Sequence, residues 1–472
     1  MRRLIYPFFC LLVVATTALS STRPPAVAGS FYPADRAELA FQINKFLDNV
    51  PTAPSTGEIV ALLVPHAGYP FSGQVAAYGY KQLVGQSFDR VVLIGASHHL
   101  SFDQIALPSW DKFATPLGEV PVDRDFIDKM LKLNSRLVVN DEPHKAEHSL
   151  EVQLPFLQSV LKEFKVVPIL FGNISLANCQ ALAYALSYLV DDRTLIVVST
   201  DWSHYHPSGL AKKLDDQGIK DVVGGSLEGF VRDLAAGNCE ACGASGVITA
   251  LLLTPALGAN RTELLKQANS GGTTGDLSSV VGYATIAFRR VAVPLTAVER
   301  QKLLKIARRT LENKLAGHKL PVFAPPEPAL NEPKGVFVTL KKDGKLRGCI
   351  GYIRSAKPLF QAVQEMAVAA ATEDRRFSPV TKGELKGLEI ELSVLSRMRE
   401  VKELSEIEVG RDGLYIMKDQ ASGILLPQVA VEWGWDRAEF LKQVCLKAGL
   451  PDNAWPDQDA RLYRFTAQVF RQ

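Results

Sequence analysis

The fold is decided by a short apolar run, IVALLV, which occupies Ile59 to Val64 and ends at Pro65-His66. A bounded run of this length, rich in β-branched residues, is typical of a buried strand. Similar runs follow: RVVLIGA at 90–96, FKVVPILF at 164–171, TLIVVS at 194–199 and a last strand at 280–291. Helical patterns lie between them, as at 177–190 and 244–253. This alternation predicts an α/β fold with a mainly parallel sheet flanked by helices.

Three of these strands end in polar turns. His66 follows the first strand, His98 and His99 follow the second, and Asp201 and His204 follow the run at 194–199. In an open parallel sheet the carboxyl ends of the strands share one edge, where ligands bind. A divalent metal needs three or four donors that converge from rigid elements. The sequence therefore predicts a shared metal or catalytic site at this edge, although a single histidine after a strand is more often a hydrogen-bonding turn residue.

A Cys-x-x-Cys pair, Cys239 and Cys242, precedes the helix expected at 244–253. A thiol at a helix N-terminus is expected to have a lowered pKa, which suits a metal ligand or a nucleophile. The same spacing is also found in redox dithiols and in structural disulfides. The residues alone leave these alternatives open.

The stretch His144-Lys145-Ala146-Glu147-His148 matches the HxxEH pattern of a zinc peptidase. Pro143 makes His144 a helix-start residue at best, so a peptidase is the less favoured interpretation. The plainer one is a helix over 148–157, on which His148 and Glu151 act as caps or orient neighbouring groups.

The chain has 472 residues, more than one hydrophobic core usually covers. Its 47% hydrophobic and 22% charged residues are typical of globular proteins, and a net charge of +3 gives no reason to expect a nucleic-acid partner. Seven of the eight histidines precede residue 210. We therefore expect two domains of different chemistry, at 21–292 and 293–472.

The second domain shows an α+β pattern, with a helix at 298–315, a strand at 335–341 and a hairpin turn at Asp343-Gly344. After that turn, Arg347 could bind an anion and Cys349 could react. A tightly packed strand with a buried cysteine is an equally good interpretation. One arginine of Asp374-Arg375-Arg376 is expected to pair with Asp374 rather than with a ligand.

The first twenty residues read as a secretory signal, with Arg2 and Arg3 before an apolar run from Leu4 to Ala18. This predicts a periplasmic or secreted protein without membrane attachment after cleavage; if the signal is not real, the protein is cytoplasmic. No other stretch of the sequence reaches the length of a membrane span.

Two known families are represented by motifs that occur in order. Residues 24–290 resemble the Memo family, through the stretches AGSFYP at 28–33, PHAGY at 65–69, SHH at 97–99, EHSLE at 147–151, DWSH at 201–204, Cys242-Gly243 and SSVVGY at 278–283. Residues from about 298 to 470 resemble the AMMECR1 family, through LRGCIG at 346–351, DRRF at 374–377, LPQVA at 426–430 and GWD at 434–436. Such fusions are similar to AmmeMemoRadiSam proteins, which implies a radical SAM protein as partner.

The Memo resemblance implies a fold related to class III extradiol dioxygenases and one transition metal ion. By motif, its ligands fall on His66, His98 and Cys242, and a thiolate favours Fe(II) or Cu(I) over Mg²⁺ or Ca²⁺. Asp201, His204 and His148 are then candidates to orient the ligands or to exchange protons. The AMMECR1 resemblance implies that Arg347, Cys349 and Arg376 belong to its characteristic motif.

Three kinds of function remain open from the sequence. The first is a metal-dependent redox enzyme acting on a small molecule, whose thiolate ligand argues against ring cleavage. The second is a metal-handling protein without turnover. The third is an interaction module in which the second domain docks a protein or an anionic ligand.

Overall fold

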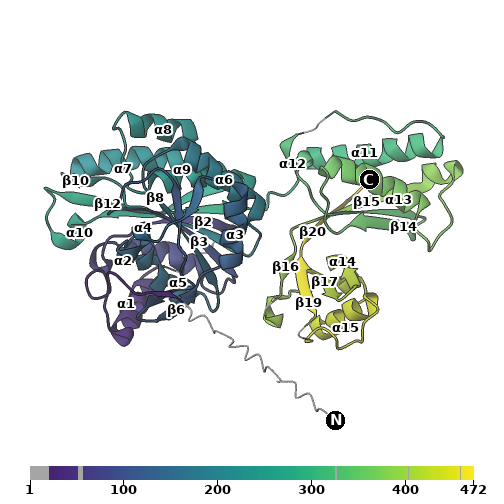
Figure 1. Cartoon of the computed structure of the whole chain (residues 1–472). Helices are drawn as coiled ribbons and strands as arrows, with labels where there is room; N and C mark the ends of the chain where they lie inside the picture. Colours follow the sequence, from purple (N-terminus) through teal and green to yellow (C-terminus); the bar gives the residue numbers. More distant parts are fainter. Residues whose placement is uncertain (1–20, 52–56, 325–326, 402, 458) are drawn as a thin grey trace, which may run out of the picture. The chain divides into compact units, whose positions relative to one another are not determined.

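The computed structural model describes residues 21–51, 57–324, 327–401, 403–457 and 459–472. The chain divides into two units between Val291 and Ala292 (Figure 1). The expected signal segment, residues 1–20, lies outside the described residues. Within the described ranges, no helix has the length and apolar character that crossing a bilayer requires.

A nine-stranded sheet forms the centre of the first unit. In spatial order its strands are β10 (His204–His206), β12 (Val280–Arg290), β2 (Glu58–Val64), β9 (Thr194–Ser199), β3 (Arg90–Ala96), β8 (Lys165–Phe171), β4 (Ile105–Leu107) and β7 (Leu137–Val139), with β11 (Arg261–Asn269) paired to β12. The central strands β2, β9, β3 and β8 run parallel. All six residues of β9 are buried, which explains why these strands are apolar throughout rather than alternating.

The edges of this sheet differ from the expected parallel arrangement. Strand β12 is antiparallel to β2, β10 and β11, and β4 is antiparallel to β8. Strands β11 and β12 are joined only by residues 270–279, which are too few for a parallel crossover. The prediction of a mainly parallel sheet is therefore right for the centre and wrong for the edges, and the unit is a mixed α/β domain.

Helices cover both faces of the sheet (Figure 1). One face carries α1 (Arg36–Asp48), α2 (Tyr69–Tyr80) and α5 (Leu154–Val160), and the other carries α6 (Leu176–Leu189) and α9 (Ala244–Ala256). The remaining elements are η1 (Lys81–Leu83), α3 (Arg124–Leu133), α4 (Glu142–Lys145), η2 (Glu151–Gln153), α7 (Ser208–Val223), α8 (Leu227–Ala235), α10 (Gly271–Thr274) and a small sheet of β1 (Thr22–Arg23), β5 (Lys112–Thr115) and β6 (Gly118–Pro121).

The helix expected at 148–157 is wrong in its first half. The 3₁₀ turn η2 begins at Glu151, and α5 begins only at Leu154. Pro155 stands in the first turn of α5, the part of a helix where proline costs no hydrogen bond. His148 therefore lies in the irregular segment before the helix, where its direction is set by loop contacts.

The second unit contains two antiparallel four-stranded sheets. The first is β14 (Lys345–Tyr352), β13 (Val336–Lys342), β15 (Leu388–Leu395) and β20 (Ala467–Arg471); the second is β16 (Arg399–Glu400), β19 (Arg461–Phe465), β17 (Gly413–Lys418) and β18 (Ala421–Leu425). Its helical elements are α11 (Ala297–Leu315), α12 (Pro328–Asn331), α13 (Leu359–Thr372), η3 (Lys382–Gly387), η4 (Leu404–Glu406), α14 (Pro427–Glu432) and α15 (Arg437–Lys447). Asp343 and Gly344 both have positive φ, as the expected tight hairpin turn requires. The unit has the expected α+β pattern.

Candidate metal centre

His66 stands directly after β2 and is only 2% exposed. Its backbone N–H donates to Oδ1 of Asp201 at 2.7 Å, which ties the turn after β2 to the turn after β9. Strands β2 and β9 are parallel neighbours, so their carboxyl ends lie side by side. The position of the His66 backbone therefore follows from the order of the strands and from one buried carboxylate.

The hydrogen bonds around Ser199 assign the tautomer of His66. The Ser199 hydroxyl donates to the carbonyl oxygen of Ser149 at 2.5 Å and accepts from Nε2 of Gln153 at 2.8 Å. Its oxygen lies 2.9 Å from Nδ1 of His66, and because its own proton is already used, it accepts the Nδ1–H. The Nε2 atom of His66 is therefore unprotonated, as a metal ligand must be. Burial and then His98 and His148 lower the pKa of His66, so the ring is neutral.

His98, two residues after β3, is oriented by Glu147. Oε2 of Glu147 accepts the backbone N–H of His98 at 2.6 Å, and Oε1 lies 2.9 Å from Nδ1 of the ring. Oε1 also accepts the backbone N–H groups of His148 and Ser149 at 3.0 and 2.8 Å. Burial would raise the pKa of Glu147, but these bonds overcome it and lower the pKa well below its usual range. An ionised Glu147 thus holds the proton of His98 on Nδ1 and leaves Nε2 to face the site.

Cys242 completes the cluster, because Gly243 lets the start of α9 approach the end of β9. A Cβ atom at Gly243 would lie 2.5 Å from the carbonyl oxygen of Ser199, which is closer than any side chain allows. The Cys242 sulfur lies 3.2 Å from Nε2 of His66 and accepts the backbone N–H of Asp201 at 3.2 Å. Burial, followed by the Asp201 carboxylate, raises the pKa of this thiol. The expected lowering of this pKa at the helix N-terminus is therefore wrong, because burial of the thiol raises it.

The three donor atoms of His66, His98 and Cys242 lie within 4.8 Å of one another. Two imidazole nitrogens whose other nitrogen is held by a hydrogen bond, together with one sulfur, form a donor set that suits a soft or borderline transition metal ion. His98 is 29% exposed at its side chain, so the cluster is reached from solvent on that side. The residues present fit a bound metal ion.

A second group, His98, Glu147 and His148, also has ligand atoms within the same distance. We do not assign it as a metal site, because both oxygens of Glu147 already accept hydrogen bonds from His98 and its neighbours. Glu147 acts here by fixing the ring of His98.

The three other predicted site residues of this unit differ in how close they lie to the donors. Asp201 is buried, which raises its pKa to about 7, although it also accepts the backbone N–H of His66. The ring of His148 lies 4.5 Å from that of His98, and burial lowers its pKa to about 4. His204 is not among the converging donors: its backbone N–H donates to Oε2 of Glu240 at 3.2 Å, and burial lowers its pKa.

Cys239 and His99 do not join the cluster. Cys239 is a buried free thiol, so the disulfide alternative for Cys239 and Cys242 is wrong here. The ring of His99 lies 6.4 Å from that of His148, and His99 is not among the donors that converge in the described part of the chain.

The peptidase pattern fails on geometry. Helix α4 ends at Lys145, so His144 and His148 do not share a helix face. The Nε2 atom of His144 lies 3.2 Å from the carbonyl oxygen of Ala106 and its ring lies 6.4 Å from that of Phe113, and His144 is not among the converging donors. The less favoured interpretation as a zinc peptidase, which needs His144 and His148 on one helix face, is therefore wrong.

Sequence reasoning missed Glu147 and Ser199 as the residues that fix the tautomers of the two histidine ligands. Glu147 was noted as part of the HxxEH pattern and of the EHSLE stretch at 147–151, but without a role, and Ser199 only as the last residue of an apolar strand. Both are polar residues that lie at or near the buried ends of strands. Because buried polar groups need hydrogen-bond partners, this position could have indicated that they bind the histidines.

Replacing Glu147 by Gln is expected to weaken metal binding by about 10–100-fold while leaving one site per chain at saturation. An amide cannot accept hydrogen bonds on both terminal atoms, so either the backbone N–H or the Nδ1–H of His98 loses its acceptor. Anaerobic competition against a chromophoric chelator measures the affinity. Glu142→Gln, an exposed carboxylate in the same segment, is the matched control and should leave the affinity unchanged.

The predicted residues of the second unit are held by internal bonds. Arg347 donates to both oxygens of Glu384, at 2.8 and 3.2 Å, and to the carbonyls of Ser378 and Pro379. Arg376 binds Asp374 through two nitrogens, as expected for one of the two arginines. The Cys349 sulfur accepts the hydroxyl of Thr339 at 3.2 Å. The suggestion that Arg347 binds an anion is wrong, since its guanidinium is already occupied by a carboxylate and two carbonyls.

Arg347→Ala is expected to destabilise the second unit by roughly 2 kcal/mol, because it leaves Glu384 and two loop carbonyls without their charged donor. Urea unfolding followed by circular dichroism measures the change. Arg375→Ala, at an exposed position of the adjacent turn, should change stability by less than about 0.5 kcal/mol. Equal stability of the two variants would contradict the structural role of Arg347.

Comparison with known proteins gives two consecutive family matches. The model of the family described as Memo-like protein matches residues 23–287, and that of AMMECR1 matches residues 304–470. A MEMO1 family protein of Methanopyrus kandleri is 35% identical over 280 residues, 57% of this chain and 99% of that protein. A protein of Methanothermobacter thermautotrophicus is 47% identical over 188 residues, 38% of this chain and 97% of that protein. The crystal structure of an uncharacterized protein from Pyrococcus horikoshii shares 42% identity over 36% of this chain and 90% of that chain, with a TM-score of 0.35.

Proposed function

Since this chain belongs to the Memo-like protein family and carries an AMMECR1 domain after its Memo-like domain, we propose that the first domain is a metal-dependent redox enzyme for a small molecule. Its metal ion is held by Nε2 of His66, Nε2 of His98 and the Cys242 sulfur. The observation that carries this proposal is the convergence of these three donor atoms within 4.8 Å. The class of the fold, related to class III extradiol dioxygenases, is part of the same proposal.

The donor set supports Fe(II) or Cu(I) as the metal. A thiolate with two imidazoles suits soft or borderline ions and disfavours Mg²⁺ and Ca²⁺, which prefer oxygen. When bound, either ion supplies one-electron redox chemistry. The raised pKa of Cys242 means that its proton must leave as the metal enters, so binding is expected to release a proton.

The residues around the donors are suited to hold protons and a substrate. His148 is neutral near pH 7, because burial lowers its pKa, and its ring lies beside that of His98. It can accept a proton from a substrate hydroxyl. Asp201, with a pKa of about 7, can exchange a proton near neutral pH while its Oδ1 holds the His66 backbone. The exposed side of His98 is the direction from which a small molecule can enter.

Metal handling without turnover is the second candidate. The observation that favours it is the sulfur donor of Cys242, which stands where the dioxygenases of the proposed fold class use a carboxylate. A thiolate ligand strengthens the retention of Cu(I) and is itself open to oxidation, which suits storage or transfer better than repeated reaction with O₂.

A radical SAM protein is the partner that we propose for the chain, by its similarity to AmmeMemoRadiSam proteins. If residues 1–20 act as a secretory signal, the protein is periplasmic or secreted, and a cytoplasmic partner would not meet it. Fractionation of cells followed by mass spectrometry of the N-terminus separates these two cases.

Metal analysis of anaerobically purified protein tests the proposed function. We expect one Fe(II) or Cu(I) per chain and, after oxidation of the loaded protein, a visible thiolate-to-metal charge-transfer band. Oxygen consumption with a panel of small phenols and catechols then separates enzyme from metal-handling protein. A chain that takes up neither metal under anaerobic conditions contradicts both candidates.

A further inference from the structure

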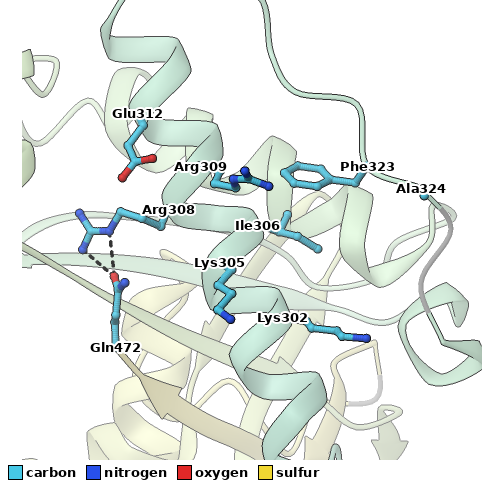
Figure 2. A pocket seen from close by; sticks show the side chains of 9 residues that line it. All are labelled: Lys302, Lys305, Ile306, Arg308, Arg309, Glu312, Phe323, Ala324 and Gln472. Atoms are coloured by element: carbon cyan, nitrogen blue, oxygen red, sulfur yellow. Dashed lines mark hydrogen bonds between the residues drawn. The ribbon is translucent and has the colours of Figure 1, made fainter.

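A cavity of about 410 Å³ opens on the second unit beside α11 (Figure 2). It lies between this helix and the extended segment that carries Phe323. Its volume falls in the range of sites for small organic molecules. The cavity belongs to the domain that holds none of the metal ligands, so its role goes beyond the proposed redox function.

The floor of this cavity is apolar. Ile306 on α11 is 7% exposed, and Phe323 is half-buried and packs against the core of the unit. The segment that carries Phe323 is tied down by Gln364, whose Nε2 donates to the carbonyl oxygen of Pro321 at 2.7 Å. In Figure 2 the Phe323 ring and the Ile306 side chain point toward each other across the opening. A flat apolar group can therefore rest on a preformed surface.

The residues that line the cavity include four basic side chains and one carboxylate, that of Glu312. Two of these cations are already used. Lys302 pairs with Glu327, and Arg308 donates to Gln472 and to the carbonyls of Leu385 and Leu388.

Lys305 and Arg309 are the two cations that remain. Within the described part of the chain, neither makes a side-chain hydrogen bond or ion pair, and both are exposed. They stand four residues apart on one helix face, an arrangement in which like charges repel and destabilise the helix. Figure 2 shows the Arg309 guanidinium directed toward the Phe323 ring. An anion bound between these two side chains would relieve the repulsion while the apolar floor contacts the rest of the ligand.

We propose that this cavity binds a small organic anion with a flat apolar body, held by Lys305 and Arg309 at its phosphate or carboxylate and by Phe323 and Ile306 at its ring. Arg308 and Lys302 keep their internal partners and contribute only to the local potential. The concave shape and the aromatic floor favour a small molecule over an extended polyanion, which would need a continuous basic surface.

Isothermal titration calorimetry of the full chain tests this site with three probes: 1-naphthyl phosphate, 1-naphthoate and inorganic phosphate. We expect at least one naphthyl anion to bind about tenfold more tightly than inorganic phosphate, because only the naphthyl probes contact Phe323 and Ile306. The preferred naphthyl probe tells whether the natural ligand carries a phosphate or a carboxylate. Absence of binding by both naphthyl probes up to about 1 mM would overturn the proposal.

Variants locate the binding. The double change Lys305→Gln and Arg309→Gln should lower the affinity for the naphthyl anion by more than about tenfold, since both charge-assisted hydrogen bonds are lost. Lys314→Gln removes one charge from an exposed position of the same helix outside the cavity, and should alter the affinity by less than about twofold. Phe323→Ala should lower the affinity for the naphthyl probes and leave the affinity for inorganic phosphate unchanged. Equal affinities of the double variant and the unaltered chain would place the binding elsewhere and overturn the proposal.

Discussion

Cys242→Ser is expected to lower the metal affinity by more than about a hundredfold, beyond the loss expected for a residue that only orients a ligand. A serine hydroxyl keeps its proton near neutral pH and is a hard donor, so it cannot replace a thiolate toward Fe(II) or Cu(I). Two histidine nitrogens alone would remain. Anaerobic titration against a chromophoric chelator measures the affinity, and loss of the charge-transfer band in the oxidised protein identifies the sulfur as a ligand.

Two other cysteines provide controls for this variant. Cys349→Ser should leave metal content unchanged, because Cys349 lies in the second unit, where its sulfur accepts a hydrogen bond from the Thr339 hydroxyl. Cys239→Ala should also retain the metal, since this buried thiol is not among the three converging donors. If Cys242→Ser retains full affinity while Cys239→Ala loses it, the sulfur ligand has been assigned to the wrong member of the pair. If the variants His66→Ala, His98→Ala and Cys242→Ser all retain the metal affinity of the unaltered chain, the assignment of this metal site is wrong.

The metal ligands could be predicted because parallel strands impose a common edge. Strands β2, β9 and β3 are adjacent in that order, so the turns that follow them meet without any closeness in sequence. The choice of His98 over His99 could not be made in this way. Consecutive residues of an irregular turn point in different directions, and only the two bonds from His98 to Glu147 decide which ring faces the site.

The residues that orient the ligands depend on a segment without regular structure, residues 146–150, and this explains why they were missed. Periodicity predicts helices and strands, but it says nothing about the path of a loop. The helix expected at 148–157 failed for the same reason. The helical spacing of apolar residues continues upstream of Pro155, but the backbone is α-helical only from Leu154 onward. Arg347 shows a related limit, because a sequence does not reveal whether an arginine meets a ligand or a carboxylate of its own chain, here Glu384.

Arg23 is the residue that holds this irregular segment in place. Its side chain is 1% exposed and pairs with the fully buried Glu151 at 2.6 Å. The same guanidinium donates to the carbonyl oxygens of His144 and Glu147, both at 2.7 Å. Glu151 in turn accepts the backbone N–H groups of Ala26 and Val27. The start of the described chain is thereby bonded to the loop that carries Glu147 and His148.

Arg23→Met is accordingly expected to destabilise the first unit by about 3–5 kcal/mol, because it leaves the buried charge of Glu151 without its partner. For a unit of this size the loss corresponds to a fall in Tm of roughly 10 °C. The variant that remains folded should also bind metal about tenfold more weakly, since the carbonyl of Glu147 loses its donor and the Glu147 carboxylate is less well placed toward His98. Differential scanning calorimetry and chelator competition at a temperature well below Tm measure the two effects.

A double-mutant cycle with Glu151→Gln separates the buried charge from simple loss of packing. In the Glu151→Gln background no carboxylate is left unpaired, so the further change Arg23→Met should cost clearly less than it does in the unaltered chain. Arg36→Met, which removes an exposed arginine near the start of α1, should leave both Tm and metal affinity unchanged. If Arg23→Met lowers Tm without any change in metal affinity, the loop 146–150 holds Glu147 in place by its own contacts, and the described N-terminal segment serves stability alone.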